Sequence, residues 1–372
     1  MLRGPEMMDE DTLGVLLRRY LDEQLDGEVE LAWQGGEPMM RGIDLFAKAF
    51  SLAERLARPG QRVRHVLQTN GTLIDETWAS LLADHQVLVG ISMDGPAVYH
   101  DRYRRNKAGR GSHDQVLRGW RLLEEYGVQR NVLCTVHAAN QHHPLEVYRY
   151  FRDELGATHM QFIPIVERVR SRDLSVAEHV WRRTGDGRLF YEQAGHSVTS
   201  RSVEPSAWGD FLSRVWDGWF EHDIGSVFVQ AFDVMLGNYL GIYSLCAHAP
   251  ECGNALVVAH NGDVYSCDHW VEEQHRLGNV RDERFEDMVI SRRHHDFNLM
   301  KPHLPSDCLF VLSDGLVRVD VPKTGSDLTG MVACGSIICA RGIVHSSAMP
   351  AMESLAWRTC CNEGCRRRWC RE

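Results

Sequence analysis

The chain has 372 residues, of which 44% are hydrophobic and 25% charged, a composition typical of a globular protein with two or three domains. Its 41 Lys and Arg residues against 51 Asp and Glu give a net charge of −10, which argues against general nucleic-acid binding because that requires a basic face. No window approaches the about 18 apolar residues of a membrane span, and the first residues carry no secretion signal. We therefore expect a cytoplasmic protein with neither a nucleic acid nor a membrane as partner.

The first 240 residues alternate short apolar runs, typical of strands, with segments of helical periodicity. The strands are predicted over residues 29–33, 63–67, 87–91, 131–136, 159–164 and 227–231. The helices are predicted over residues 42–56, 75–82, 112–126, 144–155 and 208–222, with Asp75 and Ser112 as N-caps. This alternation indicates parallel βαβ units, in either an open doubly wound sheet or a barrel.

Polar loops that contain glycine follow the first three strands. They are Gln34-Gly35-Gly36-Glu37-Pro38, Gln68-Thr69-Asn70-Gly71 and Ser92-Met93-Asp94-Gly95-Pro96. Each loop alone is typical of a turn. Because the carboxyl ends of parallel strands meet at one edge of a sheet, three such loops together favour a ligand site there.

Cysteine divides the chain into two parts. Of the 11 cysteines, only Cys134 precedes Cys246, and it lies in an apolar strand, where we expect a core residue. Cytosolic proteins rarely form disulfides, so the dense group from Cys246 to Cys370 indicates metal binding. We predict a body over residues 1–240 and a cysteine-rich domain over residues 241–372.

Four motifs in this order resemble the radical S-adenosylmethionine (SAM) enzymes, and specifically the anaerobic sulfatase-maturating enzyme family. Three are the segments Trp33-Gln34-Gly35-Gly36-Glu37-Pro38, Gln68-Thr69-Asn70-Gly71-Thr72-Leu73 and Gly90-Ile91-Ser92-Met93-Asp94-Gly95-Pro96. The fourth is Cys252 followed by nine residues, Gly262, four residues and Cys267, which is similar to the opening of the SPASM auxiliary-cluster motif. The resemblance runs from about Met8 to Cys308.

The resemblance implies an α/β fold, a partial (β/α)6 radical SAM barrel with a C-terminal cysteine-rich SPASM-like domain. Family members hold [4Fe–4S] clusters and reductively cleave SAM, with a flavodoxin or ferredoxin as an external electron donor. The deoxyadenosyl radical takes a hydrogen from Cβ of a cysteine or serine on a sulfatase polypeptide, and loss of a second electron and a proton yields Cα-formylglycine. The sequence does not distinguish a cysteine-type from a serine-type target.

The resemblance also implies which residues contact SAM. Gly36 lies where the backbone approaches the methionine moiety closely, which favours glycine. Ser92 and Arg104 match positions that contact SAM, and the planar fork of Arg104 suits a carboxylate. Val166, after the fifth predicted strand, matches a further SAM-contacting position.

In the cysteine-rich part, the resemblance assigns one proton acceptor and four ligands. Asp268 matches the general base that removes the proton from the substrate thiol or hydroxyl. Cys246, Cys252, Cys267 and Cys308 match ligands of the auxiliary iron–sulfur clusters. By ligand count alone, four cysteines bind zinc equally well, and the resemblance favours iron–sulfur.

Two departures from the family bear on activity. The Cys-x3-Cys-x2-Cys motif of the catalytic cluster, which precedes the segment matched by residues 8–13, is absent from the printed sequence. We therefore expect the polypeptide as written to lack the first barrel strand and not to cleave SAM. After Cys308, three family cysteines are replaced by Val311, Val317 and Val321. A cysteine codon read one base early after a G becomes a valine codon, so we expect residues of about 309–348 to be translated out of frame; true divergence is the alternative.

Three hypotheses follow. The chain is a sulfatase-maturating oxidoreductase, or a truncated non-catalytic relative that binds an iron–sulfur or zinc centre and a peptide partner, or a zinc-stabilised α/β protein of unrelated role. An in-frame Cys-x3-Cys-x2-Cys upstream separates the first from the second, and iron and sulfide analysis separates both from the third.

Overall fold

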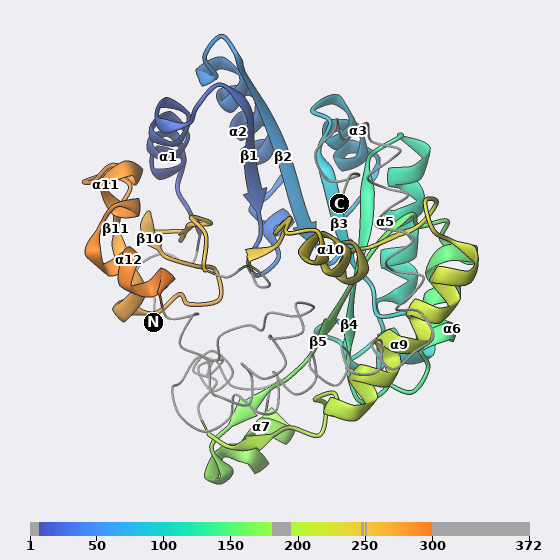
Figure 1. Ribbon diagram of the computed structural model, residues 1–372. Helices are drawn as coiled ribbons and strands as arrows, with labels where there is room; N and C mark the ends of the chain where they lie inside the picture. Colours follow the sequence, from blue (N-terminus) through green and yellow to red (C-terminus); the bar gives the residue numbers. More distant parts are fainter. Residues whose placement is uncertain (1–6, 181–194, 247–248, 250, 300–372) are drawn as a thin grey trace, which may run out of the picture.

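The computed structural model describes residues 7–180, 195–246, 249 and 251–299. Its centre is a parallel six-stranded sheet with the order β1-β2-β3-β4-β5-β8 (Figure 1). The strands are β1 Gly27–Trp33, β2 Gln61–Thr69, β3 Leu88–Ser92, β4 Arg130–Val136, β5 His159–Pro164 and β8 Phe228–Val229. Because all neighbouring strands are parallel, their carboxyl ends, where the three polar loops begin, share one edge.

Helices cover the outer face of this sheet, as Figure 1 shows. They are α2 Ile43–Leu56, α3 Glu76–Asp84, α5 His113–Glu125, α6 Pro144–Arg149 and α9 Pro205–His222. Alternate strand residues such as Leu67, Val89 and Val132 are fully buried beneath them in one large core. The residues between them point to the inner face, which carries polar side chains near the carboxyl ends of the strands. This architecture confirms the partial radical SAM barrel predicted from the sequence.

Several sequence predictions are confirmed in their main features. All six predicted strands form, Cys134 is fully buried, and Asp75 caps α3 by accepting a hydrogen bond from the Trp78 amide at 2.9 Å. The last strand was predicted too long, because α10 (Gln230–Tyr239) takes over its second half.

Two helix predictions were wrong in detail. Ser112 precedes α5, but its hydroxyl makes no cap and instead donates to the Arg104 carbonyl at 3.0 Å. The helix predicted from Pro144 to Leu155 divides into α6 and a π-helical turn over Tyr150–Glu154.

Further elements complete the described part of the chain. Before β1 lies α1 (Glu10–Glu23), and the loops after the strands carry a 3-10 turn at Pro38–Arg41, α4 (Ala97–Tyr103), β6 (Arg168–Val169), a 3-10 turn at Ser171–Asp173, α7 (Leu174–Val180) and β7 (Ser197–Val198). A C-terminal unit contains β9 (Val257–Val258), β10 (Asp263–Tyr265), a 3-10 turn at Glu273–His275, β11 (Arg276–Asn279), α11 (Phe285–Val289) and α12 (Arg292–Asn298). Among the described residues, no helix is both long enough and apolar enough to cross a membrane.

The C-terminal unit packs against α1, on the left of Figure 1. The Arg19 side chain donates to the Arg281 carbonyl at 2.9 Å, and Arg281 in turn donates to the Thr12 hydroxyl at 2.7 Å. The rings of Tyr20 and Phe285 meet edge to face with centroids 5.8 Å apart. These contacts fix the position of the C-terminal unit relative to the sheet.

Candidate cofactor and substrate site

The loops after β1 and β2 are joined by one carboxylate, that of Glu37. Its Oε1 accepts from the Thr69 hydroxyl at 2.7 Å and from the Met39 amide at 3.1 Å, while Oε2 accepts from the Asn70 amide at 2.8 Å. Each carboxylate oxygen of Glu37 thus accepts a hydrogen bond from Thr69 or Asn70, where β2 ends and its loop begins. The loops after β1 and β2 therefore meet at this edge of the sheet, where the protein's own hydrogen bonds hold them together.

Two glycines precede Glu37 and open space beside the backbone. Gly35 and Gly36 have φ angles of +98° and +59°, which favour glycine, and a Cβ on Gly36 would meet no atom within 4 Å. The space beside this backbone is therefore open to a ligand, and the contact of Gly36 with the methionine moiety of SAM stays a prediction.

Arg104 lies after α4 and is held by Asp94. Arg104 donates from Nε to Oδ2 of Asp94 at 2.6 Å and from Nη2 to Oδ1 at 2.9 Å, and Nη2 also reaches the Thr135 hydroxyl at 2.9 Å. Burial raises the pKa of Asp94, but the Arg104 and His137 side chains outweigh it and hold this pKa well below its usual range. Asp94 is therefore a buried carboxylate whose charge is balanced by Arg104.

Ser92 and Val166 lie at the same edge. The Ser92 hydroxyl, at the end of β3, accepts a hydrogen bond from Gln68 Nε2 at 3.3 Å, which links β2 to β3. Val166 follows β5 and packs, partly buried, against the main core. Gly36, Ser92, Arg104 and Val166 thus all follow the carboxyl ends of strands of one parallel sheet.

Asp268 of the C-terminal unit reaches the end of β1. Its Oδ2 accepts from Gln34 Nε2 at 3.0 Å, and its Oδ1 lies 2.9 Å from Nδ1 of His269. The His269 hydrogen bond outweighs partial burial and holds the pKa of Asp268 below its usual range, while the same contact raises the pKa of His269 to about 10. Asp268 is therefore ionised and able to accept a proton, but pairing with His269 weakens it as a base.

Three metal-ligating side chains gather at this point. One ligand atom each of Cys267, Asp268 and His269 lies within 4.8 Å of the others. Cys246 is exposed, and Cys252 is partly buried. Thiolates are ordinary ligands of iron–sulfur clusters, so the chemistry of these cysteines and Cys267 fits an iron–sulfur cluster. Cys308, the valines at 311, 317 and 321, and the segment expected to be out of frame lie outside the described residues.

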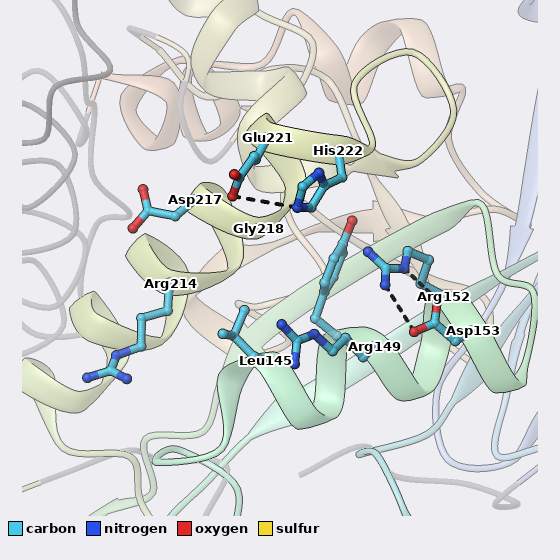
Figure 2. A pocket seen from close by; sticks show the side chains of 10 residues that line it. Leu145, Arg149, Arg152, Asp153, Arg214, Asp217, Gly218, Glu221 and His222 are labelled. Atoms are coloured by element: carbon cyan, nitrogen blue, oxygen red, sulfur yellow. Dashed lines mark hydrogen bonds and ion pairs between the residues drawn. The ribbon is translucent and has the colours of Figure 1, made fainter.

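One surface cavity lies elsewhere, between α6 with its π-helical turn and α9 (Figure 2). It measures about 550 Å³, and two pairs of its lining side chains interact, Arg152 with Asp153 at 2.6 Å and Glu221 with His222 at 3.6 Å. None of its lining residues belongs to the candidate site.

Sequence reasoning missed the partners of the site residues. Glu37, Gln34 and Asp94 stood inside the quoted motifs without assigned roles, Thr135 was not singled out, and His269 was overlooked. The run Cys267-Asp268-His269, three adjacent residues of metal-ligating type, was the available signal for His269.

Comparison with sequence families matches two regions. Residues 3–151 match the radical SAM superfamily, and residues 246–315 match SPASM, the iron–sulfur cluster-binding domain. The second match includes Cys246, Cys252, Cys267 and Cys308.

Curated relatives and solved structures agree with these matches. The chain is 36% identical to the serine-type anaerobic sulfatase-maturating enzyme of Bacteroides thetaiotaomicron, over 81% of this chain and 71% of the relative. It is 31% identical to the cysteine-type anaerobic sulfatase-maturating enzyme of Clostridium perfringens, over 78% and 73%. Native anSMEcpe, solved with bound AdoMet and the Cp18Cys peptide, superposes with a TM-score of 0.79 at 26% identity, over 95% of this chain and 92% of that chain.

Proposed function

Because this chain belongs to the anaerobic sulfatase-maturating enzymes of the radical SAM superfamily, we propose that it converts a cysteine or serine of a sulfatase polypeptide to Cα-formylglycine. The observation that carries the proposal is the contact between Gln34 and Asp268. It brings a carboxylate of the C-terminal unit to the edge of the sheet where the loops after β1, β2 and β3 meet. A radical site and a proton acceptor are then within reach of one substrate side chain.

We assign SAM to that edge. The open backbone at Gly36 accommodates the methionine moiety, and Ser92, Arg104 and Val166 complete the contacts. The residues fit such a ligand because the loops are already cross-linked by Glu37 and Asp94, so little ordering accompanies binding. The solved relative anSMEcpe has AdoMet bound, which supports the assignment.

We assign iron–sulfur ligation to Cys246, Cys252, Cys267 and Cys308, within a SPASM-like domain over residues 241–372 that follows a partial barrel over residues 1–240. When bound, one [4Fe–4S] cluster together with SAM would supply the radical that takes a hydrogen from Cβ, and the auxiliary clusters would accept the second electron. A flavodoxin or ferredoxin is the proposed external donor.

Asp268 is the proposed catalytic base. Gln34 orients the carboxylate through Oδ2, and Oδ1, which also accepts from the Cys267 thiol at 3.5 Å, is the oxygen proposed to take the proton of the substrate thiol or hydroxyl. His269 occupies Oδ1 at 2.9 Å in the structure, so the substrate must replace that contact. The side chain of His269 is 78% exposed, which leaves it room to turn away.

The alternative proposal is a non-catalytic relative that binds one metal centre and a peptide. The proximity of Cys267, Asp268 and His269 favours it, because a thiolate, a carboxylate and an imidazole also suit zinc. In that case Asp268 is a ligand and accepts no substrate proton.

Formylglycine formation tests the main proposal. A form that also carries the family's Cys-x3-Cys-x2-Cys motif is incubated anaerobically with SAM, a strong reductant and sulfatase peptides containing the target cysteine or serine. We expect an aldehyde on at least one peptide, detected by mass spectrometry and hydrazide capture. Deoxyadenosine formation without aldehyde on either peptide would contradict the substrate assignment.

A further inference from the structure

Asp94 is not among the residues proposed to contact SAM, yet each of its polar atoms makes a hydrogen bond within the protein. We propose that Asp94 is a positioning residue that fixes the orientation of Arg104, so that Arg104 presents its Nη1 group to SAM. The inference rests on the proposed function, because it deepens the assignment of SAM to the edge of the sheet.

The Asp94 side chain connects Arg104 to the end of β4. The residue is 2% exposed, and Oδ1 accepts from Arg104 Nη2 and from the Thr135 amide, both at 2.9 Å. Oδ2 accepts from Arg104 Nε at 2.6 Å. A buried carboxylate with three such donors has one orientation, and the planar guanidinium that pairs with it has one as well.

The backbone around this pair is held from both sides. The Asp94 amide donates to His100 Nδ1 at 3.3 Å, and the Asp94 carbonyl accepts from Asn140 Nδ2 at 3.1 Å. On the opposite edge of the same ring, His100 Nε2 lies 3.0 Å from the Ser112 hydroxyl, which donates to the Arg104 carbonyl at 3.0 Å. The His100 ring therefore joins the backbones of Asp94 and Arg104.

The pairing determines what Arg104 offers a ligand. Its Nε–Nη2 edge is occupied by Asp94 and Thr135, and within the described part of the chain Nη1 makes no hydrogen bond. The Arg104 side chain is 26% exposed, so it reaches solvent at this edge. The sequence pointed to a bidentate Arg–carboxylate contact with the ligand; the structure shows that the bidentate contact is made within the protein.

Asp94→Asn tests the inference with little change of shape. An Asn places an amide donor opposite either Arg104 Nε or both Arg104 Nη2 and the Thr135 amide, so at least one donor loses its acceptor. We expect SAM affinity, measured by saturation-transfer NMR titration, to fall roughly tenfold, since bonds to charged groups contribute at that scale. Arg104→Gln should reduce the affinity by a similar factor.

The double variant separates positioning from a general structural role. If Asp94 acts through Arg104, adding Asp94→Asn to Arg104→Gln costs no further affinity. Asp223→Asn is the matched control, since Asp223 pairs with Arg152, whose side chain is also 26% exposed, at 2.8 Å beside the remote α6–α9 cavity. We expect Asp223→Asn to lower the melting temperature without changing SAM affinity.

If circular dichroism shows that Asp94→Asn is unfolded, Arg104→Lys tests the same inference. Lysine keeps the charge but cannot pair with both carboxylate oxygens, so we expect the same roughly tenfold loss. Unchanged SAM affinity in Asp94→Asn or Arg104→Lys overturns the inference. It is also overturned if Asp94→Asn lowers SAM affinity by the same factor in the parent and in the Arg104→Gln variant. These titrations use the form that also carries the family's Cys-x3-Cys-x2-Cys motif. If that form folds but shows no saturable SAM binding, the proposed function is contradicted and the inference falls with it.

Discussion

Individual side chains at the edge of the sheet depend on partners from distant parts of the chain. Asp268 shows this clearly, because its partner Gln34 directly follows β1, far away in the sequence. Its second partner, His269, is the adjacent residue. The first contact orients the carboxylate, and the second lowers its pKa. Both keep the carboxylate ionised, and the pairing with His269 weakens it as a base until the substrate replaces that contact.

Replacing Asp268 should uncouple two activities. In a form that carries the family's catalytic-cluster motif, Asp268→Asn keeps the shape of the side chain and one oxygen that can accept from Gln34, but it cannot accept a proton. Loss of a general base costs on the order of 10²–10⁴ in rate, so formylglycine formation should fall by that factor. SAM cleavage, followed as deoxyadenosine by chromatography, should persist because that step needs no base.

Asp263→Asn is a suitable control for that experiment. Asp263 pairs with Arg276 at 2.7 Å in the same C-terminal unit, so its loss perturbs a comparable contact. We expect the two activities to stay coupled in this control. Near-parent formylglycine formation by Asp268→Asn would remove Asp268 from the proposed chemistry.

The buried ring of His65 makes stability depend on pH. His65 is 2% exposed and accepts from Trp33 Nε1 at 3.2 Å, and burial lowers its pKa to about 4. Between pH 6.5 and 4 the unfolded chain binds a proton here that the folded chain does not, so stability falls as pH falls. The free energy of unfolding should drop by up to about 3 kcal/mol over this range.

Urea unfolding at several pH values measures this effect. His65→Phe suits the aromatic surroundings, because the ring centroids of His65 and Phe50 are 4.4 Å apart. The variant should flatten the dependence of the unfolding free energy on pH below pH 6.5. His222 is exposed, so His222→Gln is the control and should leave the pH dependence of the unfolding free energy as it is in the parent. An unchanged slope in His65→Phe would show that another group titrates.

At the scale of elements, α5 sets the position of the loop after β2. A Cβ on Gly119 of α5 would lie 2.5 Å from the Gly71 carbonyl oxygen and 3.2 Å from Ile74 Cβ. Gly119→Ala should therefore destabilise the fold by about 1–3 kcal/mol despite better helix propensity. Gly14→Ala in α1, where a Cβ meets nothing within 4 Å, should instead stabilise it by about 0.5–1 kcal/mol. Chemical denaturation of both variants measures the contrast, and equal effects would contradict the packing described.

Strands and long helices were predictable because burial on one face imposes a period on the sequence. The run Val87–Ile91 and the Asp75 cap are local signals of this kind. The Ser112 hydroxyl was misassigned because its partner, the Arg104 carbonyl, is brought to it by folding. The last strand was misjudged because an apolar run reads alike in a strand and in a buried helix such as α10.

For the whole molecule, the sequence predicted the fold but not the interactions of the candidate site residues. The resemblance singled out Gly36, Ser92 and Arg104, and their contact with SAM stays a prediction. That Arg104 pairs with Asp94 could not be read from the sequence, because charge and spacing do not say which acceptor an arginine meets. The contact of Gln34 with Asp268 spans more than two hundred residues, beyond any local pattern.

The 372-residue chain should bind SAM weakly or not at all, and it should not turn SAM over. The loop contacts are present, but the printed sequence has no Cys-x3-Cys-x2-Cys motif to hold the cluster that chelates the methionine group. We expect no deoxyadenosine under a strong reductant, by chromatography of the anaerobic reaction mixture. Turnover by this polypeptide would contradict our account of the absent motif.

Metal and sulfide analysis after anaerobic reconstitution tests the central claim most directly, namely that the cysteine-rich part holds iron–sulfur clusters. Cys252→Ala removes a proposed ligand, and Cys134→Ala, in the buried strand β4, is the control. We predict brown protein with bound iron, acid-labile sulfide and thiolate-to-iron absorption, reduced in Cys252→Ala and retained in Cys134→Ala. Stoichiometric zinc without sulfide would contradict the account.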